Sequence, residues 1–471
     1  MRHVIKNACV LTVNGTDEVF DPGFVLIEDE RIAAVGPMSA APPGPFDRET
    51  DAGGDFLTPG FVNLHEHEHM HLMKGVVEGI LLEPWVMKIS APSRNAMDDG
   101  DIISAHNLAA LEMLRTGTTC ALIHPSRAAQ LAQEDGAPTP NLAFGLRVSH
   151  GIAYQIRTPN QPNHPFGPAE ADADLRQRAA LYAAAPGQMN LVTAIIECNA
   201  HHTQLGRSSD ELVMAGNAVT RELGLPIASH LSGGTLSMSM GFLKYKRATG
   251  RSDVEYLERL GVLDDRWILV HGIHFTDHDI DIVAKRGASV VYTPTSENSR
   301  GGGIGPWVQM RDAGILCAMG TDGPAVDYSM DMVEQTKAAI LFQNVRHRSP
   351  ASMSSRFALR MATLNGAKAL GAGDWLGSIE AGKRADLVLF ARRRPAQWLA
   401  EDPVDAFVMA SHGTDARLVL VNGAVSYEDG RFRDGIDPAA IIAEAQDRAA
   451  SLHRRTGLDA RAIPVWPGRA A

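Results

Sequence analysis

No apolar run in the sequence is long enough to cross a bilayer. Among its 471 residues no stretch approaches the roughly 18–20 consecutive apolar residues that a spanning helix needs. The first residues, MRHVIKNACVLTVNGTDEV, lack both the apolar core and the cleavage site of a signal peptide. We therefore expect no membrane partner and no secretion.

Paired cysteines are also absent. The four cysteines, Cys9, Cys120, Cys198 and Cys317, are far apart and form no C-x-x-C pair. This spacing argues against a structural zinc finger and against disulfides, so the reducing cytoplasm is the expected compartment.

Basic residues form no cluster. The formal net charge is −11, and lysine and arginine occur in no run. A surface of this kind does not attract nucleic acid or anionic lipid, which excludes the main charged partners. We therefore expect the binding partner to be a small molecule.

Short β-rich segments occupy both ends of the chain. Residues 1–58 contain HVIKNACVLTV and GFVLIEDERIAAVG, and residues 381–435 contain ADLVLFA and ARLVLVNGAVSYEDGRF. Asn422-Gly423 is typical of a hairpin turn between strands. We expect a small β-sandwich domain built from both termini. Residues 436–471 are expected to form a helical extension that packs on the body or on a neighbouring subunit of a homo-oligomer.

Residues 59–380 show a different pattern. Apolar runs of strand length, such as TTCALIH, LVTAIIECN and RWILVHG, alternate with segments of helical pattern. Such alternation is typical of parallel β/α units, and about eight of them predict a (β/α)8 TIM barrel. The fold class is therefore α/β.

The histidine-rich stretch HEHEHMH at residues 65–71 allows two interpretations. On a helix it would contain the zinc-peptidase pattern H-E-x-x-H twice. On a strand, His65 and His67 would point to the same side and could bind one ion. The preceding Pro59-Gly60 and the β-favouring run FVNL support the strand. Four solvated loop histidines remain the third possibility.

Polar residues close most of the expected strands. In a β/α barrel the chemistry lies at the C-terminal ends of the strands, so these residues are site candidates. A mixed set of imidazoles and a carboxylate suits Zn²⁺, Fe²⁺, Co²⁺ or Mn²⁺ and leaves a position for water. The candidates are His65, His67, His124, His150, Glu197, Asn199, His201, His202, His230, His271, Tyr292, Thr293 and Asp322.

Several motifs resemble those of the amidohydrolase superfamily. They are PGFVNLHEH, HGIHFTDHDI, GGGIGPWVQMRDAGILCAMGTDG, ATLNGAKALG and GSIEAGKRADLVLF. The resemblance covers nearly the whole chain. It is closest to the branch of triazine hydrolases and of cytosine, guanine and S-adenosylhomocysteine deaminases, near which phenylurea and thiocarbamate hydrolases are found.

The resemblance implies roles for five residues. His65, His67, His230 and Asp322 would hold one divalent transition metal ion, zinc first, with iron, cobalt or manganese as alternatives. His271 would orient the hydroxide and polarise the substrate. Asp322 would also take a proton from the attacking water and pass it to the leaving nitrogen.

The chain departs from the deaminase pattern at two motifs. The deaminases have H-x-x-E after strand five, but here His230 is followed by Leu231-Ser232-Gly233. The usual histidine before the motif P-x-S-N is replaced by Tyr292. Without the glutamate we expect hydrolysis of a non-peptide C–N bond in a small amide, urea or carbamate. Deamination or dechlorination of a nitrogen heterocycle is the alternative.

The remaining candidates concern a second metal and the substrate. No lysine closes strand four, so Glu197 or Cys198 would have to bridge two ions, and we predict one metal. Glu197 would otherwise support the ligands or contact substrate. His69 and His71 are expected to cover the pocket. The predicted substrate-binding residues are His201, His202, His69, Glu197, Tyr292 and Trp85.

Overall fold

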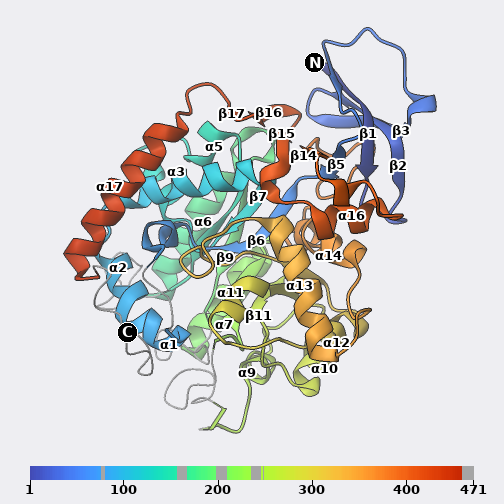
Figure 1. Cartoon of the computed structure of the whole chain (residues 1–471). Helices are drawn as coiled ribbons and strands as arrows, with labels where there is room; N and C mark the ends of the chain where they lie inside the picture. Colours follow the sequence, from blue (N-terminus) through green and yellow to red (C-terminus); the bar gives the residue numbers. More distant parts are fainter. Residues whose placement is uncertain (76–79, 156–166, 198–208, 235–245, 248, 459–471) are drawn as a thin grey trace, which may run out of the picture.

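The computed structural model describes residues 1–75, 80–155, 167–197, 209–234, 246–247 and 249–458. Figure 1 shows a barrel surrounded by helices, with a sheet attached at one side that carries the N-terminus. The C-terminal helix α17 lies across the barrel on the side away from that sheet.

Eight parallel strands form the barrel. They follow one another in sequence order from β6 to β13. β13 lies beside β6, because the backbone N–H of Asp322 donates to the carbonyl of His65 at 2.9 Å. The predicted (β/α)8 barrel is confirmed. The strands are β6 (Phe61–Glu66), β7 (Thr118–Ile123), β8 (Arg147–Ala153), β9 (Asn190–Ile195), β10 (Ile227–Leu231), β11 (Trp267–His271), β12 (Ser289–Tyr292) and β13 (Cys317–Met319).

Helices alternate with these strands, and local signals set their ends. For α7 (Asp210–Leu223), the Ser209 side chain accepts from the N–H of Leu212, and Gly224 ends the helix at φ 66°. No helix of the described residues is both long and apolar enough to span a bilayer. The others around the barrel are α3 (Asp99–Arg115), α4 (Arg127–Glu134), α5 (Asn141–Phe144), α6 (Pro168–Ala183), α9 (Asp253–Leu260), α10 (Asp277–Arg286), α12 (Trp307–Asp312), α13 (Met332–His347), α14 (Ser355–Met361) and α15 (Leu364–Ala369).

A second sheet of nine strands joins the two ends of the chain. Asn422 (φ 51°) and Gly423 (φ 71°) form the predicted turn between β15 and β16. The additional β unit built from both termini is confirmed. Its strands are β1 (Arg2–Leu11), β2 (Val19–Glu28), β3 (Arg31–Pro37), β4 (Arg48–Asp51), β5 (Phe56–Pro59), β14 (Leu387–Phe390), β15 (Ala416–Val421), β16 (Ala424–Glu428) and β17 (Arg431–Phe432). Helix α16 (Pro403–Ala410) lies between β14 and β15 in the sequence.

The C-terminal helix packs on its own chain. α17 (Pro438–Thr456) lies against α3 and against the 3-10 helix η2 (Glu68–Met73) that follows the first barrel strand. Its His453 donates from Nε2 to the carbonyl of Leu72 at 3.0 Å, and Leu452 is buried beside Leu72. Of the two predicted positions for this segment, the structure shows the contact with the body.

Candidate active site

The histidine-rich stretch begins as a strand. β6 ends at Glu66, and His67 still has an extended backbone (φ −124°, ψ 95°) before η2 starts at Glu68. Residues four apart in the two H-E-x-x-H patterns therefore do not share one face of an α-helix. The strand interpretation is confirmed, and the zinc-peptidase interpretation is wrong. None of the four histidines is solvated, because all are buried.

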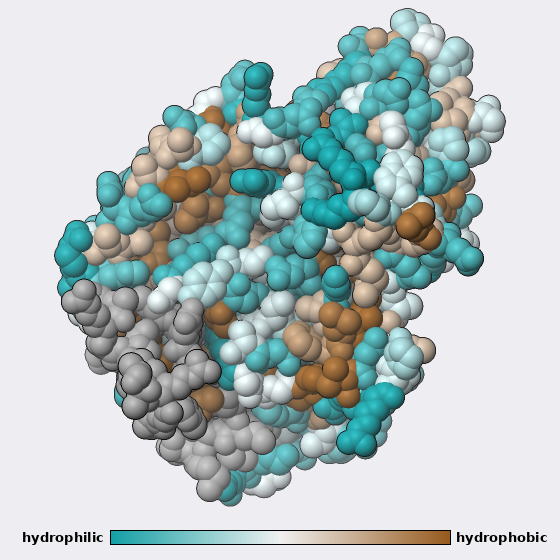
Figure 2. Space-filling view, viewed as in Figure 1, coloured by the Kyte–Doolittle hydropathy of each residue, from teal (hydrophilic) through white to brown (hydrophobic). Residues whose placement is uncertain are grey.

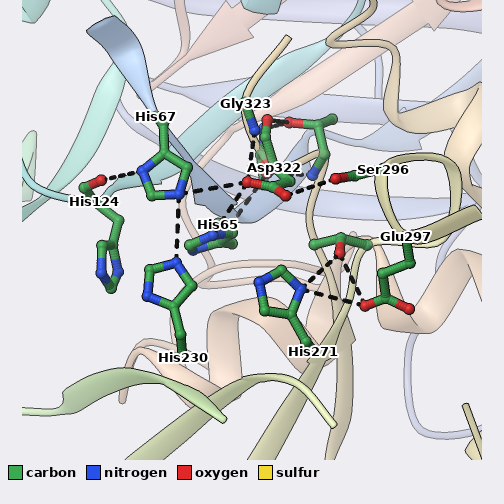
Figure 3. A network of polar contacts seen from close by, with 12 residues as sticks. His65, His67, His124, His230, His271, Ser296, Glu297, Asp322 and Gly323 are labelled. Carbon is green, nitrogen blue, oxygen red and sulfur yellow. Dashed lines mark hydrogen bonds and ion pairs between the residues drawn. The ribbon is translucent and has the colours of Figure 1, made fainter. Parts of the chain in front are cut away.

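Four predicted ligands converge at the C-terminal end of the barrel (Figure 3). Nε2 of His65 lies 3.5 Å from Oδ1 of Asp322, and Nε2 of His67 lies 3.4 Å from the same oxygen. Nε2 of His230 is 3.4 Å from Nε2 of His67. Three imidazole nitrogens and one carboxylate oxygen thus surround a single point, although they come from β6, β10 and the end of β13.

Unmade hydrogen bonds support a metal at this point. The side chain of His65 is fully buried; within the described part of the chain its Nδ1 has no hydrogen-bond partner, and its Nε2 faces Oδ1 of Asp322 at 3.5 Å. Nδ1 of His67 donates to the carbonyl of His124, which leaves the Nε2 lone pair available. Burial is the main cause that lowers the pKa of both imidazoles. Neutral imidazoles are the form that binds metal, so the donor set fits a divalent ion.

Asp322 is held as a carboxylate. Its Oδ1 accepts from the N–H of Gly323 at 2.8 Å, and its Oδ2 accepts from the hydroxyl of Ser296 at 2.6 Å. Burial alone would raise its pKa, but the contact with His65 and the charge of Arg300 keep the pKa well below its usual range. Its backbone is left-handed at φ 61°, a conformation that is rare outside glycine and is frequent at functional sites.

Glu197 supports two histidines. Its Oε1 accepts from Nδ1 of His230 at 2.5 Å and from Nε2 of His124 at 3.0 Å. Its Oε2 accepts from the N–H of His230 at 3.1 Å. A second group of residues is also close enough to hold a metal ion, but it shares His230 with the first. It consists of His124, Glu197 and His230. The contacts of Glu197 with His230 are hydrogen bonds that orient His230.

His271 stands beside the ligand set with a strained backbone. Its ring centroid lies 5.7 Å from that of His65 and 5.4 Å from that of His230. Its φ is 86°, again in the left-handed region. Nδ1 faces the hydroxyl of Thr293 at 3.2 Å and the carboxyl of Glu297 at 3.3 Å.

Three residues at this site, Ser296, Glu297 and Arg300, were not among the strand-end candidates. All come from α11 (Pro294–Ser299) or its end, directly after β12. The signal for Glu297 was present, because it occupies the asparagine position of the motif P-x-S-N. Nη2 of Arg300 lies 3.8 Å from Oδ2 of Asp322, and Cζ of the same guanidinium lies 4.5 Å from the ring centroid of Trp85.

The other predicted substrate-binding residues have the following surroundings. His69 is buried with its ring 5.7 Å from that of His67, and burial lowers its pKa to about 3. Trp85 is buried among apolar side chains beneath Arg300.

His201 and His202, like Cys198, lie outside the described residues. Tyr292, predicted to contact substrate, is fully buried, and its ring stacks on that of Trp307 with the centroids 4.3 Å apart. Alternation along β12 turns Tyr292 outward.

Comparison with known proteins gives a consistent result. The profile of the Amidohydrolase family matches residues 56–425. The chain is 30% identical over 459 residues to 5-methylthioadenosine/S-adenosylhomocysteine deaminase of Desulforamulus reducens, which covers 96% of this chain and 99% of that protein. It is 29% identical over 454 residues to 5'-deoxyadenosine deaminase of Methanosarcina mazei, with 96% and 98% covered.

Solved structures show the same fold. A zinc-bound adenosine deaminase from Xanthomonas campestris superimposes with a TM-score of 0.85 at 25% identity, over 96% of this chain and 98% of that one. The zinc complex of atrazine chlorohydrolase from Arthrobacter aurescens TC1 gives a TM-score of 0.82 at 20% identity, with 95% and 100% covered. Both proteins bind zinc.

Proposed function

The chain belongs to the amidohydrolase family, a family of hydrolases that act on C–N bonds other than peptide bonds, and we propose that it deaminates adenine-type nucleosides. One observation carries the proposal. Four ligand atoms converge beside His271 in a chain that matches adenosine-type deaminases over almost its full length. The product would be the corresponding 6-oxo compound and ammonia.

A second candidate is hydrolysis of a small amide, urea or carbamate. The stretch after His230 supports it, because this stretch carries no carboxyl group that could protonate a ring nitrogen. Ser232 donates its hydroxyl to Asp253 at 2.5 Å, and Gly233 has no side chain. The relatives favour the nucleoside, and Glu297 offers a carboxyl group elsewhere at the site.

We propose that His65, His67, His230 and Asp322 hold one divalent transition metal ion, with zinc as the first choice. When bound, such an ion lowers the pKa of water towards about 7 and makes hydroxide available at neutral pH. Asp322, kept ionised by its neighbours, accepts a proton from the attacking water and passes it to the leaving nitrogen. His271, whose ring lies beside His65 and His230, would contact the substrate next to the ligand set.

Product release from a panel of substrates tests this function, followed as ammonia for the nucleosides, as chloride for the triazine and as the freed amine for the urea and the thiocarbamate. The panel contains adenosine, 5'-methylthioadenosine, S-adenosylhomocysteine, a chlorotriazine, a phenylurea and a thiocarbamate, each assayed with zinc-loaded protein. We expect ammonia from the three nucleosides. Hydrolysis confined to the phenylurea and the thiocarbamate would overturn the nucleoside proposal and support the second candidate.

Glu197→Gln should weaken metal binding by about 10- to 100-fold, because a carboxylate that orients a metal-bound histidine has an effect of this size. Glutamine keeps the length of the side chain but removes the charge that holds Nδ1–H of His230. Zinc affinity can be measured by competition with a chromophoric chelator. The matched control is Glu68→Gln, since Glu68 is also buried and bonded to a histidine, His106 at 2.9 Å. Equal affinities in the two variants would contradict the role of Glu197.

We also propose how the chain is divided, in which compartment it resides and how it assembles. We propose the divisions 1–58, 59–380, 381–435 and 436–471. We also propose a cytoplasmic protein, in which Cys9, Cys120 and Cys317 are free and buried. We also propose a homo-oligomer, since Figure 2 shows apolar residues gathered on the face where α13 lies, and Leu341 and Val345 of that helix are exposed. Light scattering that gives the mass of one chain would contradict it.

A further inference from the structure

Glu297 is a buried carboxyl group that the ligand set does not use. Only 4% of the residue is exposed. It lies on α11, four residues after Thr293, so one helical turn brings the hydroxyl of Thr293 to its Oε1 at 3.0 Å. Its other oxygen, Oε2, is buried without a hydrogen-bond partner within the described ranges. Among the described residues, His271 is the ionisable side chain that lies within hydrogen-bonding distance of Glu297.

His271 lies between Glu297 and the ligands (Figure 3). Nδ1 of its ring is 3.3 Å from Oε1 of Glu297, while the ring itself packs beside His65 and His230. A proton that moves between Glu297 and the pocket would therefore pass through this imidazole. Burial is the main cause that raises the pKa of Glu297 well above its usual range, and the charge of Asp322 adds to it.

The position of His271 also explains the missing acid after His230. A Cβ atom at Gly233 would lie only 2.7 Å from Cδ2 and 2.9 Å from Cγ of His271. No side chain can stand there while the ring keeps this position. The imidazole of His271 therefore occupies the space that a side chain at position 233 would need.

We propose that Glu297 and His271 together hold one proton and deliver it to the substrate nitrogen, in place of an acid after His230. Glu297 acts through His271 and is a positioning residue, whereas His271 contacts the substrate. This inference rests on the proposed deamination, in which the ring nitrogen gains a proton as the adjacent carbon accepts the water oxygen.

The protons balance over the whole reaction. The pair gives its proton to the ring nitrogen while the water oxygen bonds to the carbon that bears the amino group. Asp322 takes one water proton and gives it to the amino group, and the C–N bond breaks with its electron pair on nitrogen. Ammonia leaves, the new hydroxyl becomes a carbonyl, and its proton reloads the pair. Nothing is oxidised or reduced.

Glu297→Gln tests the pair in zinc-loaded protein. Glutamine keeps the shape but holds no acid proton, and general acid catalysis contributes about 10²- to 10⁴-fold. We expect kcat with adenosine to fall at least about 100-fold with KM nearly unchanged and with full zinc content. Glu297→Asp should restore part of the rate. In protein with ¹⁵N-labelled histidine, the His271 ring signals should shift in Glu297→Gln and stay unchanged in the control Glu68→Gln.

The outcomes separate this inference from the function on which it rests. Wild-type protein that releases ammonia from adenosine, with Glu297→Gln equally fast and the His271 signals unchanged, would overturn the inference alone. A wild-type protein that cleaves only ureas or carbamates would overturn the proposed deamination. The labelled-histidine spectra would then still show whether Glu297 and His271 share a proton.

Discussion

Replacing Asp322 with asparagine is expected to lower kcat by about 10⁴-fold or more. The substitution removes a general base, which alone contributes about 10²- to 10⁴-fold, and it also removes the charge of one metal ligand. Asparagine tolerates the left-handed backbone that Asp322 adopts at φ 61°, so the change isolates the carboxylate from backbone strain. The measurement is kcat at saturating substrate with excess zinc, together with zinc content after dialysis.

Asp331→Asn is the matched control for this experiment. Asp331 is also a buried aspartate, and it caps α13 by accepting from the N–H of Val333 at 2.8 Å. Asparagine caps helices about as well, so the control should keep its activity, although it gives up the hydrogen bond that Oδ2 accepts from the N–H of Gly413 at 2.7 Å and should lose some stability. If Asp322→Asn kept a tenth of the wild-type rate with full zinc, the proposed role of Asp322 as base would fail.

Much of the architecture could be predicted because it depends on short-range patterns. Alternating apolar runs and helical segments indicated the barrel, and Asn422-Gly423 indicated a hairpin of the terminal sheet through two residues that tolerate positive φ. Pro59-Gly60 and the run after it indicated that His65 lies on a strand. The position of α17 could not be decided in this way, because its contact with Leu72 joins segments 381 residues apart.

The site was predicted less completely, and the reason is side-chain direction. Strand-end position identifies His65, His67, His230, His271 and Asp322 as candidates, but it cannot say which way a residue at the last position of a strand turns. Tyr292 turns outward onto Trp307, and the neighbouring Thr293 reaches His271 instead. Glu297 and Ser296 reach the site from a short helix after the strand, so a search of strand ends does not find them.

The barrel and the terminal sheet are joined by a fully buried ion pair. Arg147, the first residue of β8, donates from Nε and Nη2 to the two carboxylate oxygens of Asp386 at 3.1 and 2.9 Å. Asp386 precedes β14, and the same guanidinium donates to the side-chain oxygen of Asn422 in the hairpin turn at 2.6 Å. Both charged side chains have at most 1% of their surface exposed. The pair therefore fixes where the sheet sits on the barrel.

Arg147→Met is expected to lower the free energy of unfolding by about 3–5 kcal/mol, because it leaves the carboxylate of Asp386 buried without its partner. Urea denaturation followed by circular dichroism measures the loss. The control is Arg286→Met, which breaks a bidentate pair with Glu258 on the surface, where solvent screens the charges.

The double variant Arg147→Met with Asp386→Leu should regain much of the lost stability, since it buries no unpaired charge. This recovery separates the penalty of an uncompensated carboxylate from the loss of packing that any truncation of Arg147 would cause. Equal losses in Arg147→Met and Arg286→Met, or no recovery in the double variant, would show that the sheet is held to the barrel by its apolar contacts and not by this ion pair.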